Sequence, residues 1–290
     1  MSRKQQLSQL RCEISQRGYK KNPFAGRNLK LRIEYDGTDY AGWQVQKNRR
    51  KTIQGTLETA LRKILQEKVR IIASGRTDAG VHAQGQVANF KTKSAISLDR
   101  LQRALNAVLP DDIKISKIEE KSLDFNSCLN AKTKVYSYSI LNRRYSAPLL
   151  RRRVYFYYYP LDIGLMRREA RSLLGRHDFS AFCASGSGAK DRVRRVKRIS
   201  IKKNSSQLSL PVRQAGALSS QSKDSNLITI DIEADGFLYN MVRNIVGTLL
   251  EIGRGKFAQG SLKRILRSKD RKMAGPTAPA CALCLTKVNY

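Results

Sequence analysis

The chain has 290 residues, and its 56 Lys and Arg against 23 Asp and Glu give a formal net charge of +33. A compact protein with this charge repels itself, and the usual compensation is a polyanion, above all nucleic acid. Five cysteines, an odd number, do not fit the paired framework of a small secreted protein, and no apolar run approaches membrane-spanning length. We therefore expect a cytoplasmic protein without a membrane segment, whose basic residues face phosphates along much of the chain.

In the first half of the chain, the spacing of apolar residues predicts four strands and two helices. Alternating apolar residues predict strands at 30–35, 69–73, 86–90 and 113–120. Apolar residues three and four positions apart predict one helix after Thr52 and another after Ser97, with these hydroxyl residues as N-caps. The predicted order is β-α-β-β-α-β.

The second half repeats this order with additions. Alternation predicts strands at 135–141, 154–160, 196–201, 227–233 and 282–288, and helical spacing predicts helices at 162–175, at 237–252 and from Ser261. Counted from Val154, the order is again β-α-β-β-α-β, which is the ferredoxin-like split βαβ unit. The sequence therefore predicts an α+β fold of two ferredoxin-like (βαββαβ) halves in a pseudo-symmetric arrangement with an RNA-binding cleft.

Composition divides the chain into an extension and two halves. Residues 1–27 form a basic N-terminal extension without the apolar stretch of a signal peptide, and an organelle transit peptide is the alternative interpretation. Residues 28–124 form the N-terminal α/β half, and residues 125–290 form the C-terminal α/β half. Within the latter, 202–226 is rich in Ser, Gln and Lys, which is typical of a polar excursion from a hairpin.

The segment SGRTDAGVHAQGQVANF, residues 74–90, places one carboxylate, Asp78, in a glycine-rich bend between two strands. An Asp in such a bend commonly caps the turn through its own backbone. Here Arg76 precedes it by two residues, and in an extended segment both side chains project to the same side. The guanidinium would favour and orient the ionised carboxylate, so Asp78 is a candidate nucleophile or general base. His82 is more typical of local hydrogen bonding than of a catalytic base.

No cofactor or metal motif accompanies this segment. The chain lacks a Gly-Lys-Ser/Thr phosphate loop and a strand followed by GxGxxG. Cys281 and Cys284 have the spacing of half a zinc site, but there is no second CxxC and the histidines are only His82 and His177. Two core thiols are the favoured interpretation of this pair. We therefore expect chemistry on nucleic acid that uses neither a cofactor nor a metal.

Further segments extend the pattern around Asp78 along nearly the whole chain. IEYDGTDYAGWQVQ (33–46) and TIQGTLETAL precede it, and the segments that follow it are LNAVLPDDI, AKTKVYSYSI, LLGRHDFSAF, FLYNMVRNIVGTLLEIGRG and GPTAPACALCLTKVNY. In content and order this set resembles the TruA family of bacterial tRNA pseudouridine synthases. Residues 74–90 are similar to the catalytic segment of that family almost letter for letter. The resemblance begins at about Asn28.

The resemblance implies an isomerase that converts uridine into pseudouridine at positions 38–40 of the tRNA anticodon arm, without a cofactor and usually as a homodimer. It implies that Asp78 is the catalytic nucleophile, Arg76 its partner, and Arg243 a second active-site arginine. Tyr136 would pack against the target base, which must leave its stack before it reacts. Asp78 would attack either C1′ of the ribose or C6 of the base, and Tyr136 is a candidate to accept the C5 proton.

Two departures from the family pattern stand out. Cys128 occupies a position where the family commonly has an arginine, which affects one expected RNA contact, and the excursion at 202–226 is longer than usual. Without the resemblance, the alternation of Tyr136 and Tyr138 would be typical of strand core residues.

Two other functions are compatible with the sequence. The β-α-β-β-α-β order is also that of the RRM, so a tandem RNA-binding protein without activity would fit the charge. Its signature of spaced aromatic residues on a central strand is not found in this chain. A related synthase that modifies a different RNA would carry the same motifs.

Overall fold

The computed structural model describes residues 26–46, 51–204 and 226–290. Most of the predicted extension at 1–27 and most of the excursion at 202–226 lie outside these residues, and Arg27 is the first residue of a strand. The described residues form two compact units. Of the described residues, unit 1 contains those up to Val135 together with Gly188–Asp191 and Cys284–Tyr290, and unit 2 contains those within Tyr136–Ser187 and Arg192–Leu283.

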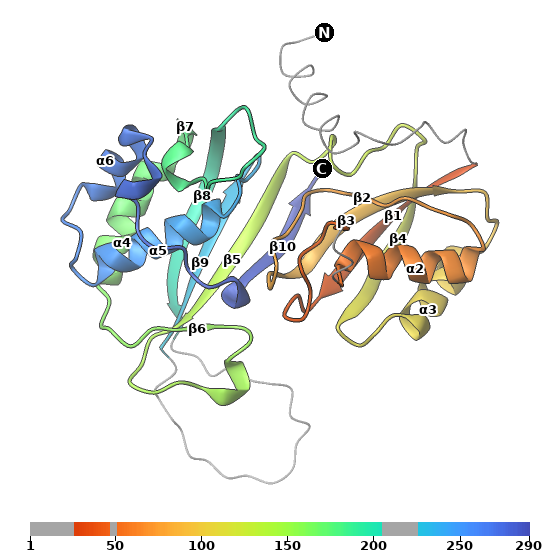
Figure 1. The fold of residues 1–290 in the computed structure, drawn as a ribbon, viewed down its shortest axis with the longest axis horizontal. Coiled ribbons are helices and arrows are strands. Elements are labelled where there is room, and N and C mark those ends of the chain that lie inside the picture. The colour runs from red at the N-terminus through yellow and green to blue at the C-terminus, as the bar shows by residue number, and fades with distance from the viewer. Residues whose placement is uncertain (1–25, 47–50, 205–225) are drawn as a thin grey trace. The chain divides into compact units, whose positions relative to one another are not determined.

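Unit 1 is a mostly antiparallel sheet with two helices (Figure 1). Its strands are β1 (Arg27–Tyr35), β2 (Ile72–Ala73), β3 (His82–Thr92), β4 (Ile113–Lys121) and β10 (Leu283–Asn289, of which the first residue belongs to unit 2). Its helices are α2 (Ile53–Leu65) and α3 (Leu98–Val108). Strand β1 lies between β4 and β3, and both pairs are antiparallel. Strand β2 pairs antiparallel with β3, whereas β10 pairs parallel with it through Cys284 and His82.

Local sequence signals explain the elements of unit 1. Leu29, Leu31 and Ile33 of β1 are completely buried and alternate with more exposed polar residues, as a strand with one face on the core requires. The side chain of Thr52 accepts a hydrogen bond from the backbone of Gly55 at the start of α2, and Ser97 caps α3 in the same way. Both predicted N-caps are therefore confirmed.

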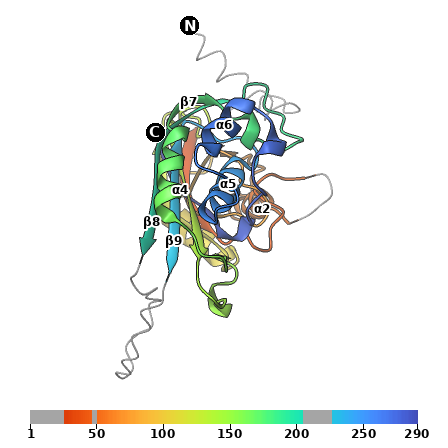
Figure 2. The ribbon, with the colours of Figure 1, turned by 90° about the vertical axis from the view of Figure 1, so that its left-hand side faces the viewer.

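Unit 2 also combines strands with helices. Its strands are β5 (Thr133–Leu141, of which the first three residues belong to unit 1), β6 (Tyr155–Phe156), β7 (Gly175–Asp178), β8 (Val193–Asn204) and β9 (Leu227–Ala234). The strands follow the order β5-β9-β8-β7, and β6 pairs parallel with β5. Its helices are α4 (Ile163–Ala170), α5 (Met241–Gly253) and α6 (Ser261–Ser268), which gather on one side of β8 and β9 (Figure 2).

Several predicted elements differ from those observed. Strand β7 was not predicted, because Gly175–Asp178 has no apolar alternation and is held by its antiparallel pairing with β8. The predicted strand at 154–160 is reduced to the two residues of β6, and α5 begins at Met241 instead of 237. The predicted mixture of helices and strands is confirmed, and the sheet is mostly antiparallel.

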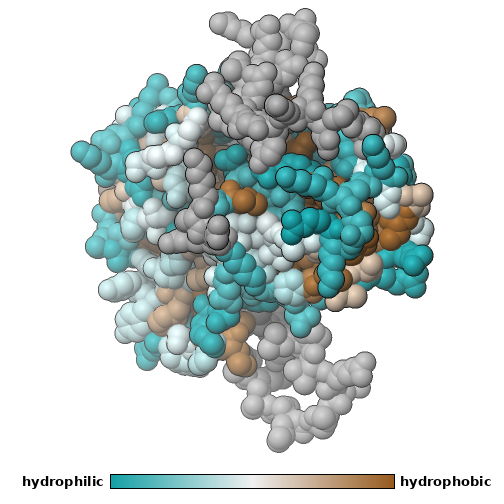
Figure 3. All heavy atoms as spheres, turned by 45° about the vertical axis from the view of Figure 1, so that its right-hand side comes forward, coloured by the Kyte–Doolittle hydropathy of each residue, from teal (hydrophilic) through white to brown (hydrophobic). Residues whose placement is uncertain are grey.

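On the face drawn in Figure 3, hydrophilic residues predominate, and hydrophobic residues form scattered areas that are most frequent toward the right of the view. Among these residues, no helix combines the length and the apolar character needed to cross a membrane.

Candidate active site

The loop that carries Asp78 joins β2 to β3 in unit 1. Arg76 is exposed, Thr77 is buried with 5% of its surface accessible, and Asp78 is half-buried. This alternation is that of an extended segment whose residues 76 and 78 face one side while 77 faces the other. The loop can therefore present a guanidinium and a carboxylate to the same ligand.

Buried hydrogen bonds fix the inner side of this loop. The hydroxyl groups of Thr77 and Tyr35 are 2.7 Å apart, and burial raises the pKa of Tyr35 so that it remains protonated. The side-chain amide of Gln86 donates to the carbonyl of Gly75 at 2.9 Å, and its oxygen accepts from Ser74 at 2.8 Å. Because buried polar groups are expensive to leave unpaired, these bonds hold the loop in one conformation.

A second loop, which follows β1, supports the backbone on either side of Asp78. The backbone N–H of Trp43 donates to the carbonyl of Thr77 at 3.0 Å, and that of Gly80 donates to Tyr40 at 3.3 Å. Gly42 has a φ of +94°, and a Cβ atom there would lie 2.8 Å from the carbonyl oxygen of Thr77. Only glycine permits both this conformation and this close approach.

His82 is a structural residue at the start of β3. It is buried, and its Nδ1 lies 3.1 Å from the backbone nitrogen of Gly37, whose N–H it accepts in the neutral ring. The same atom lies 3.1 Å from Asp36 Oδ1, a contact that is an ion pair only in the protonated ring. The geometry thus agrees with the predicted local hydrogen bonding.

In unit 2, Tyr136 lies on β5 and is 7% exposed. Its ring meets that of Phe237 edge to face, with centroids 4.9 Å apart and an interplanar angle of 83°. Phe237 belongs to the segment that connects β9 to α5. Two residues further along β5, the completely buried Tyr138 donates to the carbonyl of Pro279 at 2.9 Å, and burial raises its pKa.

Arg243 lies in the first turn of α5 and is held at two of its nitrogens. Its Nε donates to the carbonyl of Ala278 at 2.7 Å, and its Nη1 donates to the side chain of Asn240 at 2.8 Å. Asn240 lies in the same connecting segment as Phe237, so one segment contacts both Tyr136 and Arg243. Arg76 and Asp78 thus lie in one loop of unit 1, and Tyr136 and Arg243 each contact the segment between β9 and α5 in unit 2.

The prediction that Cys281 and Cys284 are core thiols is wrong about their burial. Cys281 and Cys284 are half-buried instead of being core residues, and Cys281 lies in a short 3-10 turn before β10 begins. In the described part of the chain, no three His, Cys, Asp or Glu side chains are arranged to hold a metal ion. Cys128, the departure from the family pattern, lies in a turn of unit 1 where its backbone N–H donates to Asn126.

The sequence of the chain matches a known family of RNA-modifying enzymes. The family profile described as tRNA pseudouridine synthase matches residues 32–128 and 170–290. The chain belongs to this family, within its TruA group, and is therefore an isomerase that converts uridine into pseudouridine. This assignment replaces the alternative of an RNA-binding protein without activity.

Relatives cover nearly the whole chain. This chain is 47% identical over 264 residues to tRNA pseudouridine synthase A of Acetivibrio thermocellus. The aligned region covers 91% of this chain and 100% of the relative. Over the same shares it is 45% identical to tRNA pseudouridine synthase A of Thermoanaerobacter sp. strain X514 and 43% identical to that of Caldicellulosiruptor saccharolyticus. The predicted resemblance to the family is confirmed.

Proposed function

We propose that the protein converts uridines at positions 38–40 of the tRNA anticodon arm into pseudouridine, with Asp78 as the nucleophile. The observation that carries this proposal is a half-buried carboxylate next to an exposed arginine, in a loop fixed by buried hydrogen bonds. A fixed loop holds the reacting group in a defined orientation, and such positioning is a main source of catalytic rate enhancement.

The reaction is an isomerisation, so atoms and electrons balance without a co-reactant. Asp78 attacks C1′ of the ribose or C6 of the base, and the N1–C1′ bond breaks. After the uracil turns, C5 bonds to C1′, the bond to Asp78 is released, C5 loses its proton and N1 gains one. Asp78 must be ionised to attack, and we assign Arg76 the role of favouring and orienting that form.

In unit 2 we assign two residues to the same reaction. Tyr136 would pack against the extruded uracil, and its small exposed area suits contact with a single base better than a broad stacking platform. Its hydroxyl is a candidate acceptor of the C5 proton. Arg243, already held by Ala278 and Asn240, would present its guanidinium to the RNA.

The finer description of the fold and of the assembly is part of this proposal. The strand order β4-β1-β3-β2 with two helices in unit 1 supports a ferredoxin-like half, and we propose a pseudo-symmetric second half, an RNA-binding cleft and a homodimer. We also propose that the enzyme works in the cytoplasm, where its tRNA substrate is processed.

The test is to incubate the pure protein with unmodified tRNA transcripts and map pseudouridine at single-nucleotide resolution. Pseudouridine confined to positions 38–40 supports the proposal. Pseudouridine at other positions, or only in another RNA, would contradict the substrate assignment while leaving the reaction in place.

A further inference from the structure

A short segment, Arg271–Pro279, packs directly onto the helix that carries Arg243. A Cβ atom at Gly247 of α5 would lie 1.7 Å from the carbonyl oxygen of Pro276, so the two backbones touch where only glycine fits. The backbone N–H of Gly275 donates to the hydroxyl of Thr248 at 2.9 Å. The segment is therefore fixed against the first turns of α5.

Asn244, the neighbour of Arg243, connects this segment to the interior of unit 2. It is completely buried, and its side-chain oxygen accepts from the hydroxyl of Thr277 at 2.6 Å and from Arg271 Nη2 at 3.0 Å. Its side-chain nitrogen donates to the carbonyl of Phe182 at 2.8 Å. Every polar atom of this side chain is thus used, which fixes its orientation.

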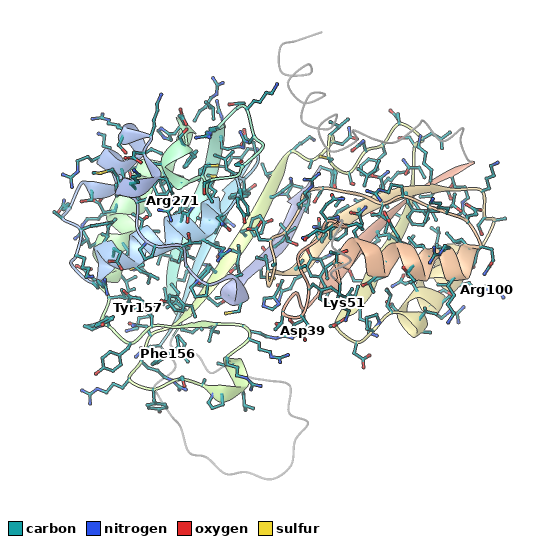
Figure 4. The ribbon with its side chains drawn as sticks, viewed as in Figure 1. Asp39, Lys51, Arg100, Phe156, Tyr157 and Arg271 are labelled. Atoms are coloured by element: carbon teal, nitrogen blue, oxygen red, sulfur yellow. The ribbon has the colours of Figure 1, made fainter. Side chains whose placement is uncertain are left out.

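Arg271, labelled in Figure 4, completes the cluster. Its Nη2 also donates to the hydroxyl of Thr277 at 3.1 Å, and its Nη1 donates to the carbonyl of Gly275 at 3.0 Å. In the part of the chain that the structure describes, no carboxylate is within ion-pair distance of Arg271. Burial lowers the pKa of the Arg271 guanidinium, which is the cost of surrounding a cation with neutral acceptors. The planar guanidinium of Arg271 offsets this cost because its donors bind Asn244, Thr277 and the backbone at the same time.

We propose that Arg271, Asn244 and Thr277 are positioning residues that fix the carbonyl of Ala278 and, through it, the guanidinium of Arg243. Ala278 directly follows Thr277, its carbonyl accepts from Arg243 Nε at 2.7 Å, and its N–H donates to the carbonyl of Arg243 at 3.2 Å. Arginine has a long flexible side chain, so a fixed acceptor at Nε determines where its remaining donors point. This inference rests on the proposed role of Arg243 in the reaction.

A matched pair of variants at Thr277 tests the proposal. Thr277→Val keeps the shape and removes the hydroxyl that Asn244 and Arg271 share, whereas Thr277→Ser keeps the hydroxyl. Because a displacement of about 1 Å in a reacting group costs about 100-fold in rate, we expect Thr277→Val to slow single-turnover pseudouridine formation by about 10- to 100-fold. We expect Thr277→Ser to react like the parent, and both variants to bind tRNA with the affinity of the parent. A Thr277→Val enzyme with the rate of the parent would overturn the proposal.

A double variant with Arg243 distinguishes a positioning role of Thr277 from a general effect on protein stability. In an Arg243→Ala background, the Thr277→Val change should cause no further loss of rate, because it acts through a side chain that is no longer there. Losses that multiply would show that Thr277 acts independently of Arg243 and would overturn the proposal. An Arg243→Ala enzyme as fast as the parent would also overturn it.

A measurement without substrate keeps this inference distinct from the proposed function. Hydrogen exchange of the Arg243 Nε–H, followed by nitrogen-15 NMR in the free protein, should be faster in Thr277→Val than in the parent and unchanged in Thr277→Ser. Arg271→Lys, which keeps the charge and loses the fork, should also accelerate it and serves if Thr277→Val does not fold. Equal exchange in all folded variants refutes the positioning role, whereas a parent protein that forms no pseudouridine refutes the proposed function.

Discussion

Asp78 and Arg76 are separated by a single residue, Thr77, which is buried and whose hydroxyl contacts that of Tyr35. The sequence predicts this pair from a local pattern, since the glycines, the spacing of two and the flanking strands are all visible within residues 74–90. It did not predict Tyr35 and Gln86 as supports of the loop. Their hydroxyl and amide gain that role only when β1 and β3 pair in three dimensions.

Replacing Asp78 by Asn tests the nucleophile. Asn keeps the size and the hydrogen-bonding outline of Asp and loses its charge, so we expect no pseudouridine, with folding and tRNA binding kept. Pseudouridine mapping, a binding titration and a thermal unfolding curve measure the three properties. Asp111→Asn, at a fully exposed carboxylate in the same unit, is the matched control and should react like the parent. A folded Asp78→Asn enzyme with normal turnover would restore the interpretation of Asp78 as a turn cap.

Substitutions of Arg76 test whether its positive charge alone, or its planar shape as well, orients the carboxylate of Asp78. Hydrogen bonds to charged groups contribute about 1.5–3 kcal/mol, so loss of the planar fork in Arg76→Lys should slow single-turnover catalysis by about 10- to 100-fold. Arg76→Ala should be slower still. If the Lys variant matches the parent while the Ala variant fails, a positive charge alone is sufficient and the oriented pair is wrong.

Two variants of Tyr136 separate the role of its ring from the role of its hydroxyl. Tyr136→Phe keeps the ring, and Tyr136→Leu loses both, with an expected loss of about 1–3 kcal/mol of base contact in the Leu variant. If the hydroxyl accepts the C5 proton, the Phe variant should stop after the Asp78 adduct forms, which trapping of a protein–RNA adduct would detect. Normal activity in both variants would return Tyr136 to the role of a core residue.

At the scale of helices and strands, elements marked by residues next to them in the sequence could be predicted, whereas contacts between distant segments could not. The α2 and α3 caps lie next to the helices they begin, so Thr52 and Ser97 identified them. Strand β7 depends on its partner β8 and carries no apolar pattern of its own. The contact between Arg243 and Ala278 joins residues 35 positions apart, and no periodicity encodes it.

The close contact of α5 with the segment at 271–279 makes a prediction about stability. In Gly247→Ala the new Cβ would meet the carbonyl of Pro276, so the segment or the helix must move. Overpacking of this kind costs about 1–3 kcal/mol or more, which urea unfolding would measure as a lower midpoint. Gly188→Ala, whose Cβ would meet no atom within 4 Å, is the control. Equal midpoints for the two variants would show that the contact yields without cost.

At the scale of the whole molecule, charge and exposed side chains suggest how the enzyme holds a large RNA. Residues 125–161 contain no Asp or Glu, and arginines at 143, 144, 151, 152 and 153 occur among them. Tyr145, 61% exposed, has the guanidinium of Arg143 4.3 Å from its ring centre. In unit 1 the exposed Arg100 lies on α3 (Figure 4). Basic residues thus occur in both units, which fits our proposal that many phosphates are neutralised while Asp78 carries out the reaction.

This surface predicts a steep dependence of tRNA binding on salt. Each neutralised phosphate releases counterions, so the logarithm of the affinity should fall linearly with the logarithm of the salt concentration. Arg151→Gln in unit 2 and Arg100→Gln in unit 1 should each lower that slope by about one unit at most, and single-turnover rates of bound tRNA should stay unchanged. The measurement combines a salt titration of binding with single-turnover kinetics for the parent and both variants. A flat salt response in the parent would mean that the charge of +33 does not serve RNA binding. A variant that loses rate on bound tRNA would instead place its arginine among the groups that act on the uridine.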